Sequence, residues 1–119
     1  MKSCVDSVRA SSKATIIIIG TKNFGYNNNF TVHLSRDERV QTRVKPLNTF
    51  LSFNDKAKVE LGSDYVDLMG MLMDPKGDVR IFNDEGKFIS YDTYHLTKDG
   101  AKYIAEVLEK NTNIFKIIN

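Results

Sequence analysis

An aspartate and a histidine three positions apart are the residues of this sequence best suited to chemistry. Asp92 and His95 lie just before a stretch of helical periodicity. A turn of that length brings a carboxylate to the imidazole Nδ1–H, which fixes the tautomer and leaves Nε2 free to take a proton from a nucleophile. The spacing therefore favours a general base. A pattern this short also arises by chance, and the alternative is a surface aspartate beside a helix-capping histidine.

The composition places these residues in an ordinary folded chain. With 119 residues, 41% hydrophobic and 27% charged, the chain is one domain or a piece of one. The net charge of +2 comes from interleaved acidic and basic residues, so no basic stripe is available and we expect no nucleic-acid partner. Cys4 is the only cysteine, and His33 and His95 have no ligand-like spacing. We therefore expect neither a metal ion nor a cofactor.

The longest apolar run, Ile16 to Ile19, is far too short to span a bilayer, which takes roughly 20 residues. The first residues are polar and charged rather than the apolar core of a secretion signal. We therefore expect no membrane contact from this segment.

The elements that must position the pair follow from periodicity. Residues 14–19 are apolar on both alternating faces, which predicts a central parallel strand covered by helices on both sides. The loop 21–29 then lies at the carboxyl end of that strand, where open α/β sheets bind ligands. We further expect a weak helix over 5–12, a helix capped by Asn48 and ended by Gly62, and a strand over 65–68. A turn over 74–77 is followed either by a hairpin of 79–82 with 87–90 or by an irregular excursion. We also expect a helix capped by Thr97 that buries Ala101, Ile104, Ala105 and Leu108, and an apolar tail over 112–119 that docks on the rest.

The block from Asp92 to Thr97, followed by Gly100 and Ala101, resembles the last conserved block of the SGNH (GDSL-like) hydrolase superfamily. It is especially similar to the version in bacterial carbohydrate O-acyltransferases. The strand and loop 16–25, the pair Asp67-Leu68 and the segment 81–87 also look like that group. The resemblance implies an α/β fold, namely the C-terminal part of a three-layer α/β/α flavodoxin-like domain with a parallel sheet. It also implies that Asp92 orients His95, which activates a serine that forms an acyl-enzyme.

Two departures from the family pattern change that expectation. No Gly-Asp-Ser nucleophile motif occurs, and Gly62-Ser63-Asp64 has the same letters in another order. The oxyanion block Gly-x-Asn-Asp is replaced by Gly20-Thr21-Lys22-Asn23. We take the Asn23 amide and the backbone near Gly20 as oxyanion donors, because a side-chain amide on a strand-end loop can bind charge that develops on a carbonyl oxygen. Rival donors are Asn27, Asn28 and Asn29.

The sheet offers an independent reason to expect a missing half. Only one other convincing core strand, residues 65–68, is present, and two strands cannot bury the 14–19 run. We therefore interpret residues 1–119 as a single partial SGNH-like domain whose first strands and serine block are absent. An upstream segment, a second copy or another chain would complete the sheet.

The function implied is that of an esterase or O-acyltransferase domain acting on acyl esters, most often acetyl, of bacterial polysaccharide, with a carbohydrate or another acyl ester as substrate. The chain alone is predicted inactive. As part of a membrane-linked acyltransferase it would work in the periplasm or outside the cell. The alternative is a non-catalytic binding or assembly module that keeps the fold without the nucleophile. A flavodoxin-like signalling domain would need an acidic phosphate-accepting cluster, which is not found.

Other side chains have simpler interpretations beside functional ones. Tyr91 and Tyr94 either stack on a sugar ring or pack against their loop. His33 is expected to be structural. The remaining sets are a solvated basic face of Arg36, Arg39, Arg43 and Lys45, and a group of gap-filling methionines, Met69, Met71 and Met73.

Overall fold

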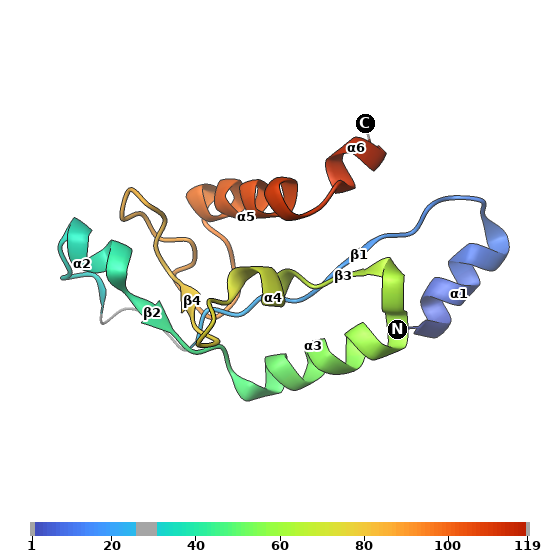
Figure 1. The fold of residues 1–119 in the computed structure, drawn as a ribbon, viewed down its shortest axis with the longest axis horizontal. Coiled ribbons are helices and arrows are strands. Elements are labelled where there is room, and N and C mark those ends of the chain that lie inside the picture. Colours follow the sequence, from blue (N-terminus) through green and yellow to red (C-terminus); the bar gives the residue numbers. More distant parts are fainter. Residues whose placement is uncertain (1, 26–30, 119) are drawn as a thin grey trace.

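A pair of short parallel strands, with helices on both sides, organises this α/β chain (Figure 1). The computed structural model describes residues 2–25 and 31–118. The elements in chain order are α1 (Lys2–Ser11), β1 (Ile18–Ile19), α2 (Arg36–Gln41), β2 (Arg43–Val44), α3 (Asn48–Leu61), the 3-10 turn η2 (Gly62–Asp64), β3 (Tyr65–Val66), α4 (Leu68–Leu72), β4 (Val79–Arg80), α5 (Lys98–Asn111) and α6 (Ile114–Ile118).

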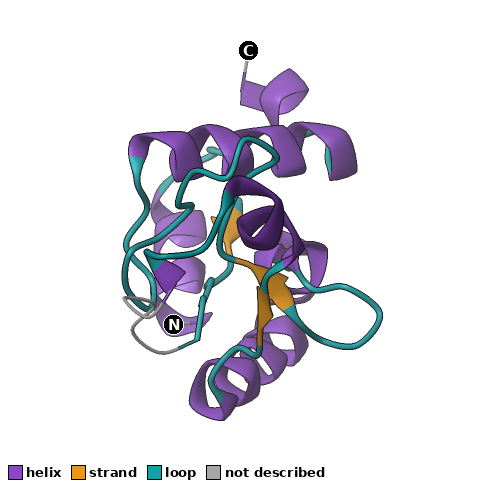
Figure 2. Cartoon of the chain, turned by 90° about the vertical axis from the view of Figure 1, so that its left-hand side faces the viewer, coloured by secondary structure: helices purple, strands orange, loops and turns teal. Residues whose placement is uncertain are grey.

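The pairing of β1 with β3 is parallel, with Ile18 opposite Tyr65 and Ile19 opposite Val66. Gly20 extends the ladder by donating its N–H to the Val66 carbonyl at 2.8 Å. In both views α5 lies on one side of this pair and α3 on the other (Figures 1 and 2). The expected parallel strand is therefore present, but it is shorter than expected. Only Ile18 and Ile19 of the 14–19 run are strand, because the neighbouring strand β3 is itself two residues long.

The isoleucine run does reach two apolar clusters, as its alternation predicts. Ile17 packs against the main core, whereas Ile16 and Ile18 pack against a second cluster of Val5, Ala57 and Leu61. Ile19 remains 46% exposed. Both faces of the run are therefore used, but its end is not covered by the described part of this chain.

The long helix α5 begins where predicted, but it buries a different face from the predicted one. Thr97 Oγ1 accepts the Gly100 N–H at 2.9 Å, which makes Thr97 the N-cap as expected. Ala101 and Ala105 are exposed rather than buried, which corrects the expected face. The helix is rotated because its glycine lies against the backbone of Ile89, where a side chain would not fit. The buried or packed face consists of Gly100, Tyr103, Ile104, Val107 and Leu108.

The hairpin that α5 packs on is narrower than predicted. Ile89 donates its N–H to the Ile81 carbonyl at 2.9 Å, and Phe82 bridges Phe88 in antiparallel register. Gly86, with φ of 76°, provides the left-handed turn residue between them. The ladder partner of β4 is β2, however, and not residues 87–90. Four fully buried side chains from this region, Val79, Ile81, Phe82 and Ile89, form the centre of the main core.

The basic segment before α3 is not a simple solvated face. Ser35 and Glu38 form a reciprocal capping box that starts α2, a signal of the type Ser-x-x-Glu that the sequence analysis missed. Arg39 donates to the carbonyls of Leu34, Gly86 and Val32, and its guanidinium lies over two core aromatic rings. Arg39 thus ties α2 to the hairpin. Arg36, Arg43 and Lys45 are exposed, as expected.

Two helix starts also differ from expectation. The N-cap of α3 is Leu47 rather than Asn48, because the Leu47 N–H donates to Asn23 Oδ1 at 2.8 Å. Gly62 follows the last residue of α3 with φ of 56°, as predicted. Asp67 ends the second strand early by capping α4. The three methionines therefore belong to α4 and its end rather than to a strand; Met71 and Met73 pack against the main core, and Met69 is fully buried.

The chain is more extended than a compact domain of its size. Its radius of gyration is 15.9 Å, against about 13.5 Å for 119 compact residues. Its accessible surface is 7816 Å², against about 6500 Å² for a compact monomer of this mass. Among residues 2–25 and 31–118, no helix is long and apolar enough to cross a bilayer.

Replacing Gly100 by alanine tests the contact between α5 and the hairpin. An added Cβ would lie 2.0 Å from the Ile89 carbonyl oxygen, which is backbone and cannot move aside cheaply. Helix propensity alone would make Gly100→Ala stabilising by about 1 kcal/mol. We expect instead a loss of about 3 kcal/mol in the free energy of unfolding by urea. Ala101→Gly, at an exposed neighbour, should cost no more than about 1 kcal/mol. Equal or greater stability of Gly100→Ala would contradict this packing.

Candidate active site

The carboxylate of Asp92 holds the ring of His95. Asp92 Oδ2 lies 2.8 Å from His95 Nδ1, so the ring donates through Nδ1 and presents Nε2 elsewhere. The other oxygen, Oδ1, accepts the backbone N–H groups of Tyr94 at 2.9 Å and His95 at 2.8 Å. The His95 side chain is 70% exposed and that of Asp92 49%. The predicted aspartate–histidine pair is therefore formed by its own turn, with the imidazole open to solvent.

Ser90 fixes the start of that turn. Its Oγ lies 2.9 Å from the Asp92 carbonyl oxygen, to which it donates, and 3.3 Å from the Asp92 N–H, from which it accepts. The side chain of Ser90 is fully buried. Ser90 was not expected at the site, although a serine hydroxyl that bonds the backbone two residues on is a known turn signal. Ser90 therefore supports Asp92 and is not placed to attack a substrate.

The same contacts explain the acidity of Asp92. The N–H of His95, then that of Tyr94, and to a lesser extent the His95 ring, lower the pKa of Asp92 from its usual value to about 2. Asp92 is therefore ionised at every pH at which the imidazole would work as a base. Its negative charge suits an imidazolium formed on His95 during proton transfer.

The loop that follows β1 reaches this turn. Phe24 donates its N–H to the Thr93 carbonyl at 2.8 Å, midway between Asp92 and His95. The neighbouring Asn23 is fully buried, and its Oδ1 accepts the N–H groups of Gly25 at 3.0 Å and Leu47 at 2.8 Å. Its Nδ2 has no hydrogen-bond partner within the part of the chain that the structure describes. Asn23 is therefore next in the chain to the residue that bonds the Asp92 turn. Its side-chain oxygen is hydrogen-bonded, whereas its side-chain nitrogen has no partner within the described residues.

The other predicted oxyanion donors are Gly20 and three asparagines of the loop after β1. The Gly20 N–H donates to the Val66 carbonyl, so this amide belongs to the sheet and is not free for an oxyanion, which corrects the expectation for Gly20. Gly20 is also where a Cβ would meet the Tyr65 hydroxyl at 2.3 Å. Asn27, Asn28 and Asn29 lie outside the described residues. Asn23 as an oxyanion donor stays a prediction.

One aromatic ring lies beside the histidine, and a second lies beside that ring. The ring of Tyr94 lies 4.2 Å from that of His95 and 6.5 Å from that of Phe50, centroid to centroid. Tyr91 instead contacts Phe88 at 4.9 Å. Both tyrosines are substantially exposed. Phe50, on α3, was not expected at the site, because nothing in the local sequence links position 50 to position 94.

No nucleophile accompanies the base among residues 2–25 and 31–118. Within those ranges the His95 ring hydrogen-bonds to Asp92, and no serine, threonine or cysteine side chain hydrogen-bonds to it. Ser63 lies in η2 beyond the end of α3, and Cys4 is exposed on α1. His33 is exposed rather than packed, contrary to its expected structural role. Within these ranges no group of three histidine, cysteine or acidic side chains is arranged to hold a metal ion.

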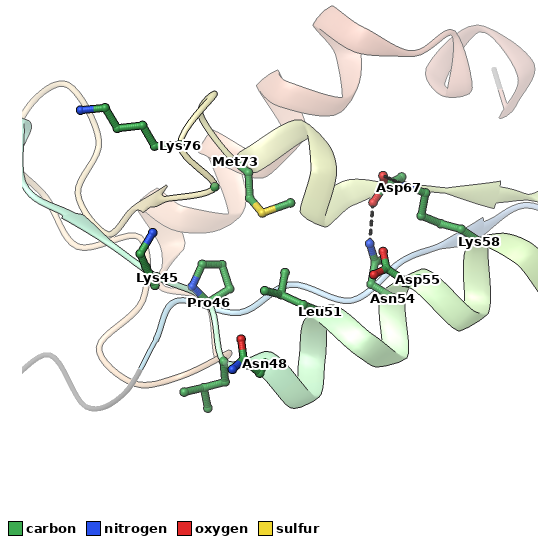
Figure 3. A pocket seen from close by; sticks show the side chains of 12 residues that line it. Lys45, Pro46, Asn48, Leu51, Asn54, Asp55, Lys58, Asp67, Met73 and Lys76 are labelled. Carbon is green, nitrogen blue, oxygen red and sulfur yellow. Dashed lines mark hydrogen bonds and ion pairs between the residues drawn. The ribbon is translucent and has the colours of Figure 1, made fainter.

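A cavity lies away from this pair. A depression of about 720 Å³ opens between the start of α3 and the turn after α4, and neither Asp92 nor His95 lines it (Figure 3). At one end Asp67 accepts from Asn54 Nδ2 at 2.8 Å and pairs with Lys58 at 3.1 Å. Partial burial raises the pKa of Asp67, but hydrogen bonds from Asn54, the Gly70 N–H and Lys58 outweigh it and keep the pKa below its usual value. These charges are matched within the chain, so this network joins α3 to the end of β3.

Comparisons of this chain with models of known protein families, with curated proteins and with solved structures find no match. The chemical interpretation of the site therefore rests on its own residues and geometry.

Replacing His95 by alanine tests what holds Asp92. The two backbone N–H donors remain in His95→Ala, and the backbone donors are the largest causes of the low pKa. We therefore expect the pKa of Asp92 to stay well below the ordinary value of about 3.9 in the variant, as measured by carbon NMR titration of its carboxyl group. Because the folded pKa is lowered, the stability that Asp92 contributes is present above about pH 4 and is lost as the pH falls toward 2. An ordinary pKa in His95→Ala would show that the ring, not the turn, holds the carboxylate.

Proposed function

We propose that this chain is the base-bearing part of an SGNH-type esterase or O-acyltransferase domain that acts on acyl, chiefly acetyl, esters of a bacterial polysaccharide. The observation that carries the proposal is the 2.8 Å contact between Asp92 Oδ2 and His95 Nδ1, with an exposed imidazole. In this mechanism Asp92 fixes the tautomer and His95 Nε2 removes the proton of a serine hydroxyl. His95 then returns that proton to the leaving alcohol oxygen when the acyl-enzyme forms.

The position of the pair supports a flavodoxin-like, three-layer α/β/α arrangement for the complete domain. The loop after β1 leaves the carboxyl end of the parallel pair and bonds Thr93, so the Asp92 turn lies at the edge of the sheet where such folds bind ligands. The helices on opposite sides of the pair agree with that arrangement (Figure 1).

The serine would come from outside this chain. The accessible surface exceeds that of a compact monomer by roughly a fifth, and Ile19 is half exposed at the end of the strand. A two-stranded parallel pair of this length is marginal without further strands. An upstream segment, a second copy or another chain that adds strands beside β1 would cover this surface and bring the nucleophile to His95.

Asn23 is the oxyanion donor in this proposal. Its Oδ1 is occupied by two backbone N–H groups, so its Nδ2 is the group left to donate. A buried donor with no competing partner binds developing negative charge more strongly than one in water.

The second candidate function is a non-catalytic binding or assembly module. It is favoured by one observation: within the described residues, no hydroxyl or thiol hydrogen-bonds to the His95 ring. In that case the Asp92 turn would be retained as structure. The two functions differ in turnover, which the following experiment measures.

His95→Ala in the complete gene product should lower the release of acetate from 4-nitrophenyl acetate by about 100-fold or more, because a general base contributes roughly that much. Asp92→Asn should lower it by a similar factor, since the amide no longer stabilises the imidazolium. The chain of residues 1–119 by itself should show no turnover above background.

Matched controls are available in the same chain. His33→Ala removes the only other histidine, which is exposed, and Asp99→Asn changes an exposed carboxylate in the first turn of α5. Both should keep the wild-type rate. A wild-type rate in His95→Ala would rule out the esterase, and a complete gene product without any turnover would favour the binding module.

A further inference from the structure

A half-exposed aromatic ring lies directly beside the proposed base. Tyr94 is 46% exposed, and its ring centroid lies 4.2 Å from that of His95 at an interplanar angle of 35°. On another side the Phe50 ring lies 6.5 Å away at 29°. Two neighbouring rings therefore support Tyr94 and leave part of it open to solvent.

The backbone of Tyr94 is fixed by the same group that orients the base. Its N–H donates to Asp92 Oδ1 at 2.9 Å, while Asp92 Oδ2 holds the His95 ring. The positions of the tyrosine and the imidazole are therefore coupled through one carboxylate. A ring held in this way loses little conformational freedom when a ligand packs on it, which favours binding.

We propose that the open part of the Tyr94 ring binds a sugar ring of the ester substrate, so that this residue selects carbohydrate esters. The inference rests on the proposed function, because it assigns the residue of that same site that recognises the sugar of the substrate. A pyranose presents an apolar C–H face that packs on an aromatic ring and a rim of hydroxyl groups that stays hydrated. A half-exposed tyrosine matches both properties, with an apolar body and a polar tip.

Other ligand classes fit the site less well. A lipid tail or a membrane surface would need a wide apolar patch, whereas the Tyr94 ring lies beside the polar side chain of His95, which is 70% exposed. A phosphate-bearing ligand would meet the Asp92 carboxylate, which is ionised at neutral pH because its pKa is about 2. A neutral, flat ligand with one apolar face is the class that remains.

The binding test uses the chain of residues 1–119 and the methyl 6-O-acetyl glycosides of glucose, galactose, mannose and N-acetylglucosamine. Binding is followed by the NMR shifts of the Tyr94 and His95 rings, and contact by intermolecular NOEs in the wild type. We expect at least one glycoside to give saturable shifts and NOEs to the Tyr94 ring protons. The absence of binding by all four at about 50 mM would overturn the proposal, as would binding without Tyr94 contacts.

Variants separate the ring from the hydroxyl and from general packing. Tyr94→Ala should weaken binding at least fivefold, whereas Tyr94→Phe, which keeps the ring, should stay within twofold. Phe53→Ala removes an aromatic ring of exposure comparable to that of Tyr94, one turn after Phe50 on α3, and should leave the affinity for the glycoside unchanged. An unchanged affinity in Tyr94→Ala would overturn the proposal. Because the NOEs are measured in the wild type, the test does not depend on the folding of any variant.

Turnover in the complete gene product distinguishes this proposal from the one it rests on. Tyr94→Ala should raise KM for an acetylated glycoside at least fivefold, and its loss of kcat/KM on that glycoside should be at least fivefold greater than its loss on 4-nitrophenyl acetate. An equal loss on both substrates would mean that Tyr94 acts only by packing His95, which overturns the sugar site and leaves the esterase standing. Sugar binding at Tyr94 with a wild-type rate in His95→Ala would overturn the esterase and leave the sugar site.

Discussion

The carboxylate of Asp92 is the group on which the candidate site depends. It accepts three hydrogen bonds from a turn of four residues, two from the backbone N–H groups of Tyr94 and His95 and one from the His95 ring. A carboxylate has room for about four such bonds, so the turn uses most of its capacity. Ser90 supports Asp92 from within the core. The imidazole is consequently oriented by local geometry, and it needs no distant residue to hold it.

The parts of the chain around this turn differ in how well they are packed. The hairpin, α4 and α5 share one core whose central side chains are fully buried, and Gly100 allows α5 to approach the backbone of Ile89. The parallel pair has little of this support, because its two strands are two residues long and Ile19 is half exposed. The well-packed half carries the aspartate–histidine pair, and the poorly covered half is the one to which the proposal adds further strands.

Where sequence and structure differ, the cause is a contact between segments distant in the chain. Leu47 replaces Asn48 as the cap of α3 because its N–H meets Asn23. The face of α5 is turned away from Ala101 and Ala105 by the contact of Gly100 with Ile89. Arg39 was expected on a solvated face, but its guanidinium lies over the aromatic rings of Phe82 and Phe88 in the hairpin. The Gly20 amide is taken up by the sheet ladder.

The sequence by itself determined the features whose residues are close neighbours. Asp92 and His95 are three positions apart, so a single turn joins them, and Thr97 with the periodicity that follows it defines α5. Only the tertiary structure decided that Phe24 meets Thr93 and that Phe50 lies beside Tyr94. Those pairs are separated by more than forty residues, and their approach depends on how the whole chain packs. Local propensity and spacing carry no information on such contacts, which is why the aspartate–histidine pair was predictable and its surroundings were not.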